Sequence, residues 1–320
     1  PELIEWIETR LSTAEDSDDD TAGTVNLQSI RKRAKYALPK PSKQGHYDGY
    51  AEAERMTTEL DDLIEQAHQA LDAEDSQTAV DILEAITEVL ATNRWPDLLP
   101  HDANSLYETI ATLGETFTEA ILLTDLDESE RETWAERLTE WDDKFRRFTA
   151  RSTLSVAAEA AREGWNNEEL QQALAGTLEE GQLDVDEPPY VDGLIASRLS
   201  VLERQGRTEE YLSLAKAAGE SQAYAEMLAQ TGKPQQAVNA AIESVSSQRA
   251  LLELAQTLRE QNQLEAALQV AEHGVTIDGI YRDTLAEWLR DRAASIGEDD
   301  LALRAASIAF KESPSKSTFR

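Results

Sequence analysis

Cysteine is absent from this chain of 320 residues. Its absence excludes disulfides, thiolate zinc sites, iron–sulfur clusters and cysteine nucleophiles. Glycine and proline are scarce, at 14 and 9 residues, which disfavours an all-β fold because such folds need many turns. No apolar run approaches the roughly 18 residues of a membrane-spanning helix, and no basic start leads into a signal-peptide core. We therefore expect a cytoplasmic protein that does not enter a membrane.

Positive charge is also scarce, since 30 lysines and arginines face 63 acidic residues and leave a formal net charge of −33. Such a surface repels nucleic acids and other polyanions except where a local basic segment interrupts it. The acidic, lysine-poor composition fits a salt-accumulating source organism, although simple drift in composition gives the same balance. The chain starts at Pro1 rather than methionine, from which we expect it to be part of a longer protein.

The first half of the chain divides by composition and periodicity. Residues 1–26 predict a short amphipathic helix followed by an acidic linker, STAEDSDDDTAGTVN. Residues 27–180 predict an N-terminal domain of long antiparallel helices, because apolar side chains recur three or four positions apart. The last long stripe is aromatic and predicts core packing rather than a cofactor site: Trp134, Leu138, Trp141, Phe145 and Phe148. Asp75 or Ser76 can cap the helix that follows the AEDSQ break, and Asp127 and Glu130 have the spacing of a capping box.

The clearest pattern follows residue 190, where the sequence repeats around four turn residues: Gly206, Gly232, Asn262 and Gly297. Four positions before them stand Leu202, Leu228, Leu258 and Ala293. Five positions after them stand Tyr211, Ala237, Ala267 and Ala302, and six positions after them Leu212, Val238, Leu268 and Leu303. Nine positions after them stand Ala215, Ala241, Ala271 and Ala306. Glycine and asparagine tolerate the left-handed conformation that ends a helix, and alanine lets the next helix approach closely.

This repeat predicts helical hairpins that stack, because one hairpin cannot bury its apolar stripe alone. Spacings of 26, 30 and 35 residues between turns bracket the tetratricopeptide period without its full residue pattern. LDAEDSQTAVDIL places Glu74 at the corresponding turn position earlier in the chain. The sequence thus predicts an all-α protein in which a bundle of long antiparallel helices precedes a TPR-like α-solenoid over residues 181–320. Its boundary, GQLDVDEPP, also fits a loop inside one continuous array.

Four long segments resemble the helical region of prokaryotic SWIM zinc finger proteins, and the opening PELIEWIETRL resembles the piece just downstream of their zinc module. The segments are LDDLIEQAHQALDAEDSQTAVDILEAITEVL, RLSVLERQGRTEEYLSLAKAAG, ALLELAQTLREQNQLEAALQVAEHGV and ALRAASIAFKESPS. The resemblance implies that zinc is bound only by an upstream module of the form CxC…CxH, which contacts DNA or protein. No ligand of that module has a counterpart here, because this chain has no cysteine.

Together, the repeat and the resemblance indicate a non-enzymatic interaction scaffold that binds a protein partner, with no cofactor or metal in this chain and no evident small-molecule substrate. The usual nucleotide, metalloprotease and serine-hydrolase motifs are absent from the sequence. First helices usually line the concave face of such an array. We therefore predict partner contacts at Tyr190, Arg198, Tyr224 and Arg249; the alternative for the tyrosines is partly buried packing.

Two alternatives remain open. The basic segment of residues 31–43, with Arg31, Lys32, Arg33 and Lys35, predicts an anion- or nucleic-acid-binding site or, alternatively, a segment docked on the protein's own acidic helices. His68 and the His101–Asp102 pair are spaced as in metal-dependent HD hydrolases, although His101 follows a proline in a loop-like run. An exposed loop histidine is the simpler interpretation of His101.

Overall fold

The structure is a computed structural model that describes residues 25–39, 49–95, 98–99, 104–146, 153–183 and 191–314. Within these ranges it contains 15 helices and no strand, which confirms the predicted all-α class. None of the described helices is long and apolar enough to cross a membrane. The predicted helix and acidic linker of residues 1–26 lie almost wholly outside the described residues.

The packing contacts divide the described chain into two units. Unit 1 holds the residues up to Asn167 together with Val191–Val201. Unit 2 holds Glu168–Leu183 together with Leu202–Pro314, so the division falls within helix α9 (Val191–Arg204). The sequence had indicated a boundary after residue 180, beside an acidic proline-containing segment whose residues 184–190 lie outside the described part.

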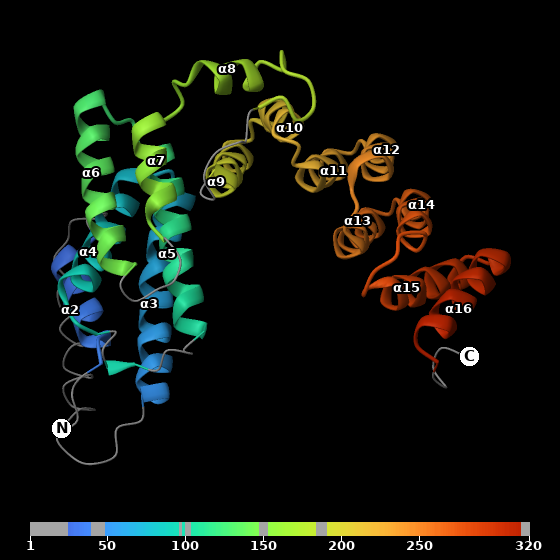
Figure 1. Ribbon diagram of the computed structural model, residues 1–320, viewed down its shortest axis with the longest axis horizontal. Coiled ribbons are helices and arrows are strands. Elements are labelled where there is room, and N and C mark those ends of the chain that lie inside the picture. The colour runs from blue at the N-terminus through green and yellow to red at the C-terminus, as the bar shows by residue number, and fades with distance from the viewer. Residues whose placement is uncertain are drawn as a thin grey trace. The chain divides into compact units, whose positions relative to one another are not determined.

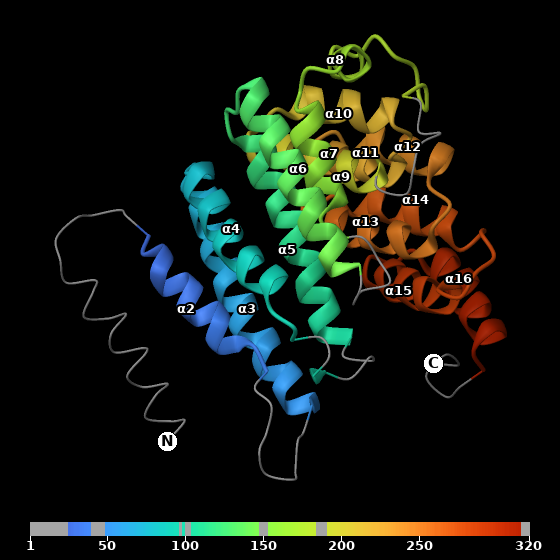
Figure 2. The same cartoon turned by 60° about the vertical axis from the view of Figure 1, so that its left-hand side comes forward.

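Unit 1 is a bundle of long helices that lie side by side in Figures 1 and 2. Its helices are α2 (Leu27–Ala37), α3 (Gly49–Asp72), α4 (Ser76–Thr92), α5 (Asn104–Leu123), α6 (Glu128–Phe145) and α7 (Ser155–Glu163). The core uses large side chains, among them the fully buried Phe117, Phe145 and Met56. The predicted aromatic stripe on α6 contributes, since Trp134 meets the Phe117 ring edge-on with centroids 5.7 Å apart.

The helix ends of unit 1 follow the predicted caps. Asp75 accepts the Thr78 amide at 3.0 Å, and Asp127 and Glu130 form a reciprocal capping box at the start of α6. Helix α2 ends at Ala37, two residues before Pro39, because proline offers no amide hydrogen and hinders the preceding turn. The two predicted N-caps are therefore confirmed.

Two close contacts, which no local pattern predicts, join the helices of unit 1. Gly114 on α5 lies against the Thr153 carbonyl, so closely that a Cβ at this position would stand 2.0 Å from the oxygen. Asp142 on α6 is 1 % exposed and accepts the backbone amides of Thr153 and Leu154 at 2.9 and 2.8 Å. Its carboxylate therefore satisfies amides at the start of α7, which has no cap from its own segment.

Unit 2 stacks helical hairpins in two rows (Figure 1). Besides the short α8 (Glu168–Leu174), its helices are α10 (Thr208–Ala217), α11 (Ser221–Gln230), α12 (Pro234–Ser244), α13 (Gln248–Glu260), α14 (Leu264–Gly274), α15 (Arg282–Ser295) and α16 (Asp299–Glu312). The first helices α11, α13 and α15 form one row, and the second helices α10, α12, α14 and α16 form the other. The predicted helical pairing is therefore present, while its assignment to a TPR-like solenoid stays an interpretation.

The turn residues have the predicted left-handed backbone. Gly206, Gly232, Asn262 and Gly297 have φ of 65°, 73°, 62° and 81°, and Glu74 joins them with φ of 61°. At each turn the next amide donates back to the carbonyl five residues earlier, as Arg207 does to Leu202 at 2.9 Å. The second helix then begins two residues after the turn in all five hairpins. The same local motif is therefore present in these five hairpins, including α3–α4 of unit 1.

The small residues of the repeat face inward as predicted in three of the four hairpins. Ala215, Ala241 and Ala271 are fully buried. The fourth hairpin differs from the prediction, since Ala306 is only half-buried. In addition, Leu303 is 72 % exposed, whereas the equivalent Leu212, Val238 and Leu268 are buried. No further described hairpin follows α16, so this position has nothing to pack against within the described part of unit 2.

The longest connection in the array lies between α14 and α15 and is held by Gln248. This side chain is 5 % exposed; its amide nitrogen donates to the Ile277 carbonyl at 2.6 Å, and its oxygen accepts the Tyr281 amide at 3.1 Å. Gly279 lies so close that a Cβ there would stand 2.5 Å from the Gln248 oxygen. Gln248 thus satisfies two peptide groups of the link, while Arg282 donates to the Val275 carbonyl at 2.9 Å and the amides of residues 275–277 donate back to α14.

Candidate functional site

The row of first helices in unit 2 carries the exposed side chains that the sequence indicated. Arg249 on α13 is exposed, and its Nε donates to Glu253 at 2.9 Å. The Glu253 carboxylate, aided by Tyr281, raises the pKa of Arg249 above its ordinary value. Tyr224 on α11 is half-exposed. Arg249 is therefore available to a partner, and Tyr224 is available in part, as the packing alternative also allowed.

Carboxylates gather where α9, α11 and α13 follow one another in unit 2. Burial is the main cause that raises the pKa of Glu226, and the charges of Glu253 and Glu203 raise it further, while the Gln222 hydrogen bond opposes them. Burial also raises the pKa of Tyr211 to about 12, again with Glu203 and Glu226 adding to the effect. The charge on Glu226 is thus poorly compensated, and a nearby cation would stabilise it.

Arg198 does not have the exposed position that we predicted from the sequence. It is 4 % exposed, within unit 1, and its Nη2 donates to Glu163 at 2.8 Å and to the Gly164 carbonyl at 3.0 Å. Burial lowers the pKa of Arg198, and the bond to Glu163 opposes this shift. The side chain joins α9 to the end of α7 and cannot contact a partner. Tyr190, the remaining predicted contact, lies outside the described residues.

The described part of the basic segment, residues 31–39, docks on acidic helices of its own unit, and residues 40–43 lie outside the described residues. Arg31 pairs with Glu88 at 3.4 Å, and Arg33 lies 3.3 Å from Glu59 and 3.5 Å from Asp62. Lys32 and Lys35 are exposed on the same helix, α2. Because half of this predicted cluster is already paired, the geometry favours the docking alternative over a nucleic-acid site.

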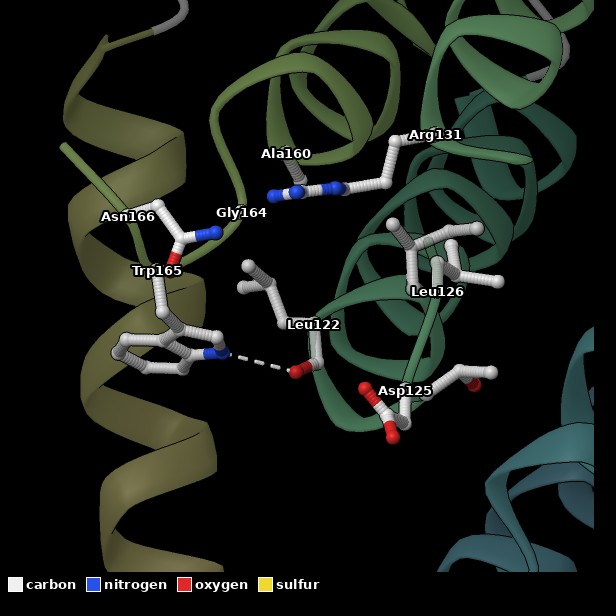
Figure 3. Close-up of a pocket in the computed structure, with 10 residues that line it drawn as sticks. Leu122, Asp125, Leu126, Arg131, Ala160, Gly164, Trp165 and Asn166 are labelled. Atoms are coloured by element: carbon white, nitrogen blue, oxygen red, sulfur yellow. Dashed lines mark hydrogen bonds between the residues drawn. The ribbon is translucent and has the colours of Figure 1, made fainter. Parts of the chain in front are cut away.

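Unit 1 also contains a small cleft of ≈ 140 Å³ where the ends of α5 and α7 meet the start of α6. Figure 3 shows Arg131 reaching across it toward the Gly164–Asn166 loop, above Leu122 and Leu126. Trp165 closes one side by donating its indole N–H to the Leu122 carbonyl at 2.8 Å. Gly164 has φ of 54°, and a Cβ there would stand 2.6 Å from Arg131 Nη1, so only glycine fits beneath the guanidinium.

The chemistry of this cleft is limited to hydrogen bonding. With the Asn166 amide turned by 180° from the orientation in Figure 3, its oxygen accepts from Arg131 Nη1 and Nη2 at 3.2 and 3.3 Å. Arg131 Nε is buried without a hydrogen-bond partner, and Asp125 is an exposed carboxylate at the rim. The cleft lining contains no serine, cysteine or histidine. This arrangement offers donors to a small acceptor, and we assign no catalytic step to it.

The histidines do not assemble into a metal centre within the described part of the chain. His68 Nε2 lies 3.1 Å from the hydroxyl of Thr116, which itself donates to the Thr112 carbonyl, so His68 is the donor in this bond. His101 and Asp102 lie outside the described residues. Among the residues with described positions, no three histidine, aspartate or glutamate side chains are placed to hold a metal ion.

Sequence reasoning missed the Arg131 cleft and the Glu226 cluster. The run Gly164–Asn167, which ends α7 with a glycine and two asparagines, is the one signal in the sequence that points to a loop at the cleft. The Glu226 cluster brings together carboxylates from three helices, and in a chain with 63 acids nothing distinguishes these by spacing.

No protein-family model matches this sequence, and no curated protein matches it either. The resemblance to prokaryotic SWIM zinc finger proteins therefore stays a prediction, carried by the four long segments and the opening segment quoted above.

Proposed function

We propose that this chain is a non-enzymatic scaffold that holds a protein segment on the first-helix row of unit 2. The observation that supports the proposal most is the hairpin array: four consecutive hairpins in residues 191–312, each with a left-handed turn residue at the same place. Such stacking exposes an extended surface to which each hairpin contributes a few side chains, which suits an elongated polypeptide better than a small molecule. In a SWIM-type protein, an upstream zinc module would contact DNA or another protein.

The charges near α11 and α13 support a partner segment with basic side chains. Glu226 is half-buried beside Glu203 and Glu253, so a lysine or arginine from a partner would offset repulsion that the chain itself leaves in place. Arg249 already occupies one side of Glu253. We therefore place the contact around Tyr224, Glu226 and Glu253, with Arg249 at its edge.

Photo-crosslinking tests the proposed surface. A photoreactive phenylalanine analogue replaces Tyr224 in the full chain, which is irradiated in cells of the source organism, and crosslinked proteins are identified by mass spectrometry. We expect a defined protein to crosslink from this position and not from Gln235, an exposed position on the second-helix row. The crosslinked segment should be rich in lysine or arginine. Absence of any crosslink specific to Tyr224 would contradict the proposal.

A charge reversal with a matched control tests the chemistry of the contact. The pair Arg249–Glu253 belongs to the first-helix row, and the pair Arg304–Glu272 belongs to the second-helix row with similar exposure. Glu253→Lys should weaken binding of the identified segment at least about 10-fold, because it removes an attractive charge and adds a repulsive one. Glu272→Lys should leave the affinity unchanged. Equal effects of the two variants would show that only the net charge matters and would reject this surface.

A further inference from the structure

The Arg131 cleft of unit 1 contains a guanidinium whose donors are largely unused. Within the described part of the chain Arg131 forms no ion pair, and its side chain bonds only the Asn166 oxygen, at 3.2 and 3.3 Å with that amide turned as above. Arg131 Nε is buried without a hydrogen-bond partner. A guanidinium carries five N–H donors and binds a carboxylate more strongly than a neutral amide. The cleft therefore offers strong donors to a negatively charged acceptor that the described residues do not supply.

The amide of Asn166 indicates where such an acceptor would lie. In the orientation of Figure 3 the Asn166 nitrogen faces the Arg131 guanidinium, so two donor groups point toward each other. Without a ligand the amide must turn by 180° to form hydrogen bonds. A carboxylate oxygen between the two groups would accept from both and would stabilise the orientation of Figure 3. Arg131 and Asn166 together thus form the anion-binding end of a candidate site.

Asp125 places an unpaired negative charge at the same cleft. It is exposed, it lines the cleft, and it forms no ion pair within the described part of the chain. In Figure 3 the Asp125 carboxylate and the Arg131 guanidinium lie on opposite sides of Leu122, and the two charges do not pair with each other. Leu126 and Ala160 complete the apolar lining of the space between them. A ligand that spans the cleft therefore meets a positive group, an apolar floor and a negative group.

The charges around the cleft favour a ligand without net charge. The neighbouring groove, which Arg131 also borders, contains three exposed carboxylates of α6: Glu128, Glu132 and Glu136. Its other charged side chains are already paired, Arg162 with Glu159 and Glu163 with Arg198. Together with Asp125, the three carboxylates repel a free anion such as phosphate. A zwitterion avoids this repulsion, because it brings its own cation and Asp125 attracts that cation.

We propose that the Arg131 cleft binds a small aliphatic amino acid, a zwitterion whose carboxylate and ammonium groups are joined by a short carbon chain. The carboxylate accepts from Arg131 and Asn166, and the ammonium group faces Asp125. The carbon chain lies on Leu122 and Leu126. A volume of ≈ 140 Å³ holds roughly five water molecules, which limits the ligand to about this size. The site lies in unit 1 and does not depend on the partner surface proposed for unit 2.

Isothermal titration calorimetry of the full 320-residue chain tests the proposal with two isomers, 5-aminopentanoate and L-valine. We expect 5-aminopentanoate to bind at least about 10-fold more tightly than pentanoate, which lacks the ammonium group, or pentylamine, which lacks the carboxylate. It should also bind more tightly than L-valine, because its chain separates the two charges as the cleft does. Tighter binding of L-valine would support the same site with both charged groups on one carbon. Binding of neither isomer, or tighter binding of phosphate than of both, would overturn the proposal.

Two substitutions then test the two ends of the ligand separately. Asp125→Asn should remove the preference for 5-aminopentanoate over pentanoate, while pentanoate binds at least as tightly as before, because only the charge that faces the ammonium group is lost. Arg131→Gln should weaken the binding of both compounds at least about 10-fold. The matched control Glu128→Gln removes an exposed carboxylate of α6 that does not line the cleft, and it should retain the preference. Circular dichroism checks that each variant is folded. A preference that survives Asp125→Asn, or binding that a folded Arg131→Gln variant retains in full, would reject the site.

Discussion

The two units bury their helices by different means. Unit 1 relies on large side chains and a few singular contacts, such as Phe117 against Trp134 and Gly114 against Thr153. Unit 2 relies on one local motif used repeatedly, a left-handed turn followed by alanines such as Ala215 and Ala241 that allow close helix approach. The comparison teaches that a repeated fold is specified locally and tolerates local change, whereas the bundle depends on a small number of contacts between distant segments.

The largest expected effect is the loss of a singular contact in unit 1. Gly114→Ala places a Cβ 2.0 Å from the Thr153 carbonyl, so α5 must move away, and we expect a loss of at least about 3 kcal/mol in the free energy of unfolding. Tryptophan fluorescence in urea measures this mainly in unit 1, which holds Trp95, Trp134, Trp141 and Trp165, whereas Trp288 is the one described tryptophan of unit 2. The exposed neighbour Glu115→Ala should change it by less than about 0.5 kcal/mol. Equal stabilities would show that the close approach does not exist.

The next effect comes from the buried carboxylate of unit 1. Asp142→Ala leaves the Thr153 and Leu154 amides without their acceptor, and we expect a loss of about 2–3 kcal/mol by the same fluorescence measurement. Asp143→Ala is the matched control, since that carboxylate is 66 % exposed and also lies near Arg146. It should be nearly neutral. A control as damaging as Asp142→Ala would mean that the loss comes from charge near Arg146 rather than from the cap.

A smaller pair of effects tests the shared turn. In Gly206→Ala the alanine must adopt the φ of 65° that glycine has here, and a Cβ would meet no other atom within 4 Å. We therefore expect the free energy of unfolding to fall by about 1–2 kcal/mol from backbone strain alone. Glu74→Gly is the opposite change, because it places glycine at the left-handed position of the α3–α4 hairpin, where φ is 61°. It should raise the free energy of unfolding by about 0.5–1 kcal/mol. Thermal unfolding followed by circular dichroism measures both. The two substitutions should change the stability in opposite directions. A change in the same direction would show that the turn of unit 1 does not follow the same rule as the turns of unit 2.

The smallest effect concerns Glu226 and depends on pH. Its pKa is raised from the ordinary 4.5, so the folded state binds this proton more readily than the unfolded state. Protonated Glu226 therefore favours folding below the unfolded pKa, and this advantage is lost as the pH rises through the folded value. Glu226→Gln should slightly raise the melting temperature at pH 7 and lose that gain near pH 4, while the exposed Glu243→Gln shows neither change. If the melting temperature of Glu226→Gln were still higher at pH 4, the charge of Glu226 would not be the cause of the gain.

Sequence reasoning reached the all-α class, the five turns and several caps because each depends on residues close together in the chain. Asp127 and Glu130 interact over three positions, and Arg207 and Leu202 over five. Arg198 was misplaced because its partner Glu163 lies 35 residues away and turns the guanidinium inward. The Arg131–Gly164 cleft escaped for the same reason. Leu303 fitted the repeat by spacing, but its exposure depends on the absence of a following described hairpin, which spacing does not encode.

The buried amide of Gln248 helps to stabilise the longest link between helices in the array. Helical arrays usually join consecutive hairpins with the shortest possible links, since each additional residue brings a peptide group that needs hydrogen-bond partners. Here Gln248 bonds the Ile277 carbonyl and the Tyr281 amide, and Arg282 donates to the Val275 carbonyl, so two side chains satisfy peptide groups of residues 275–281 that no helix satisfies. The link can therefore be longer than a tight turn while α14 still packs against both α13 and α15.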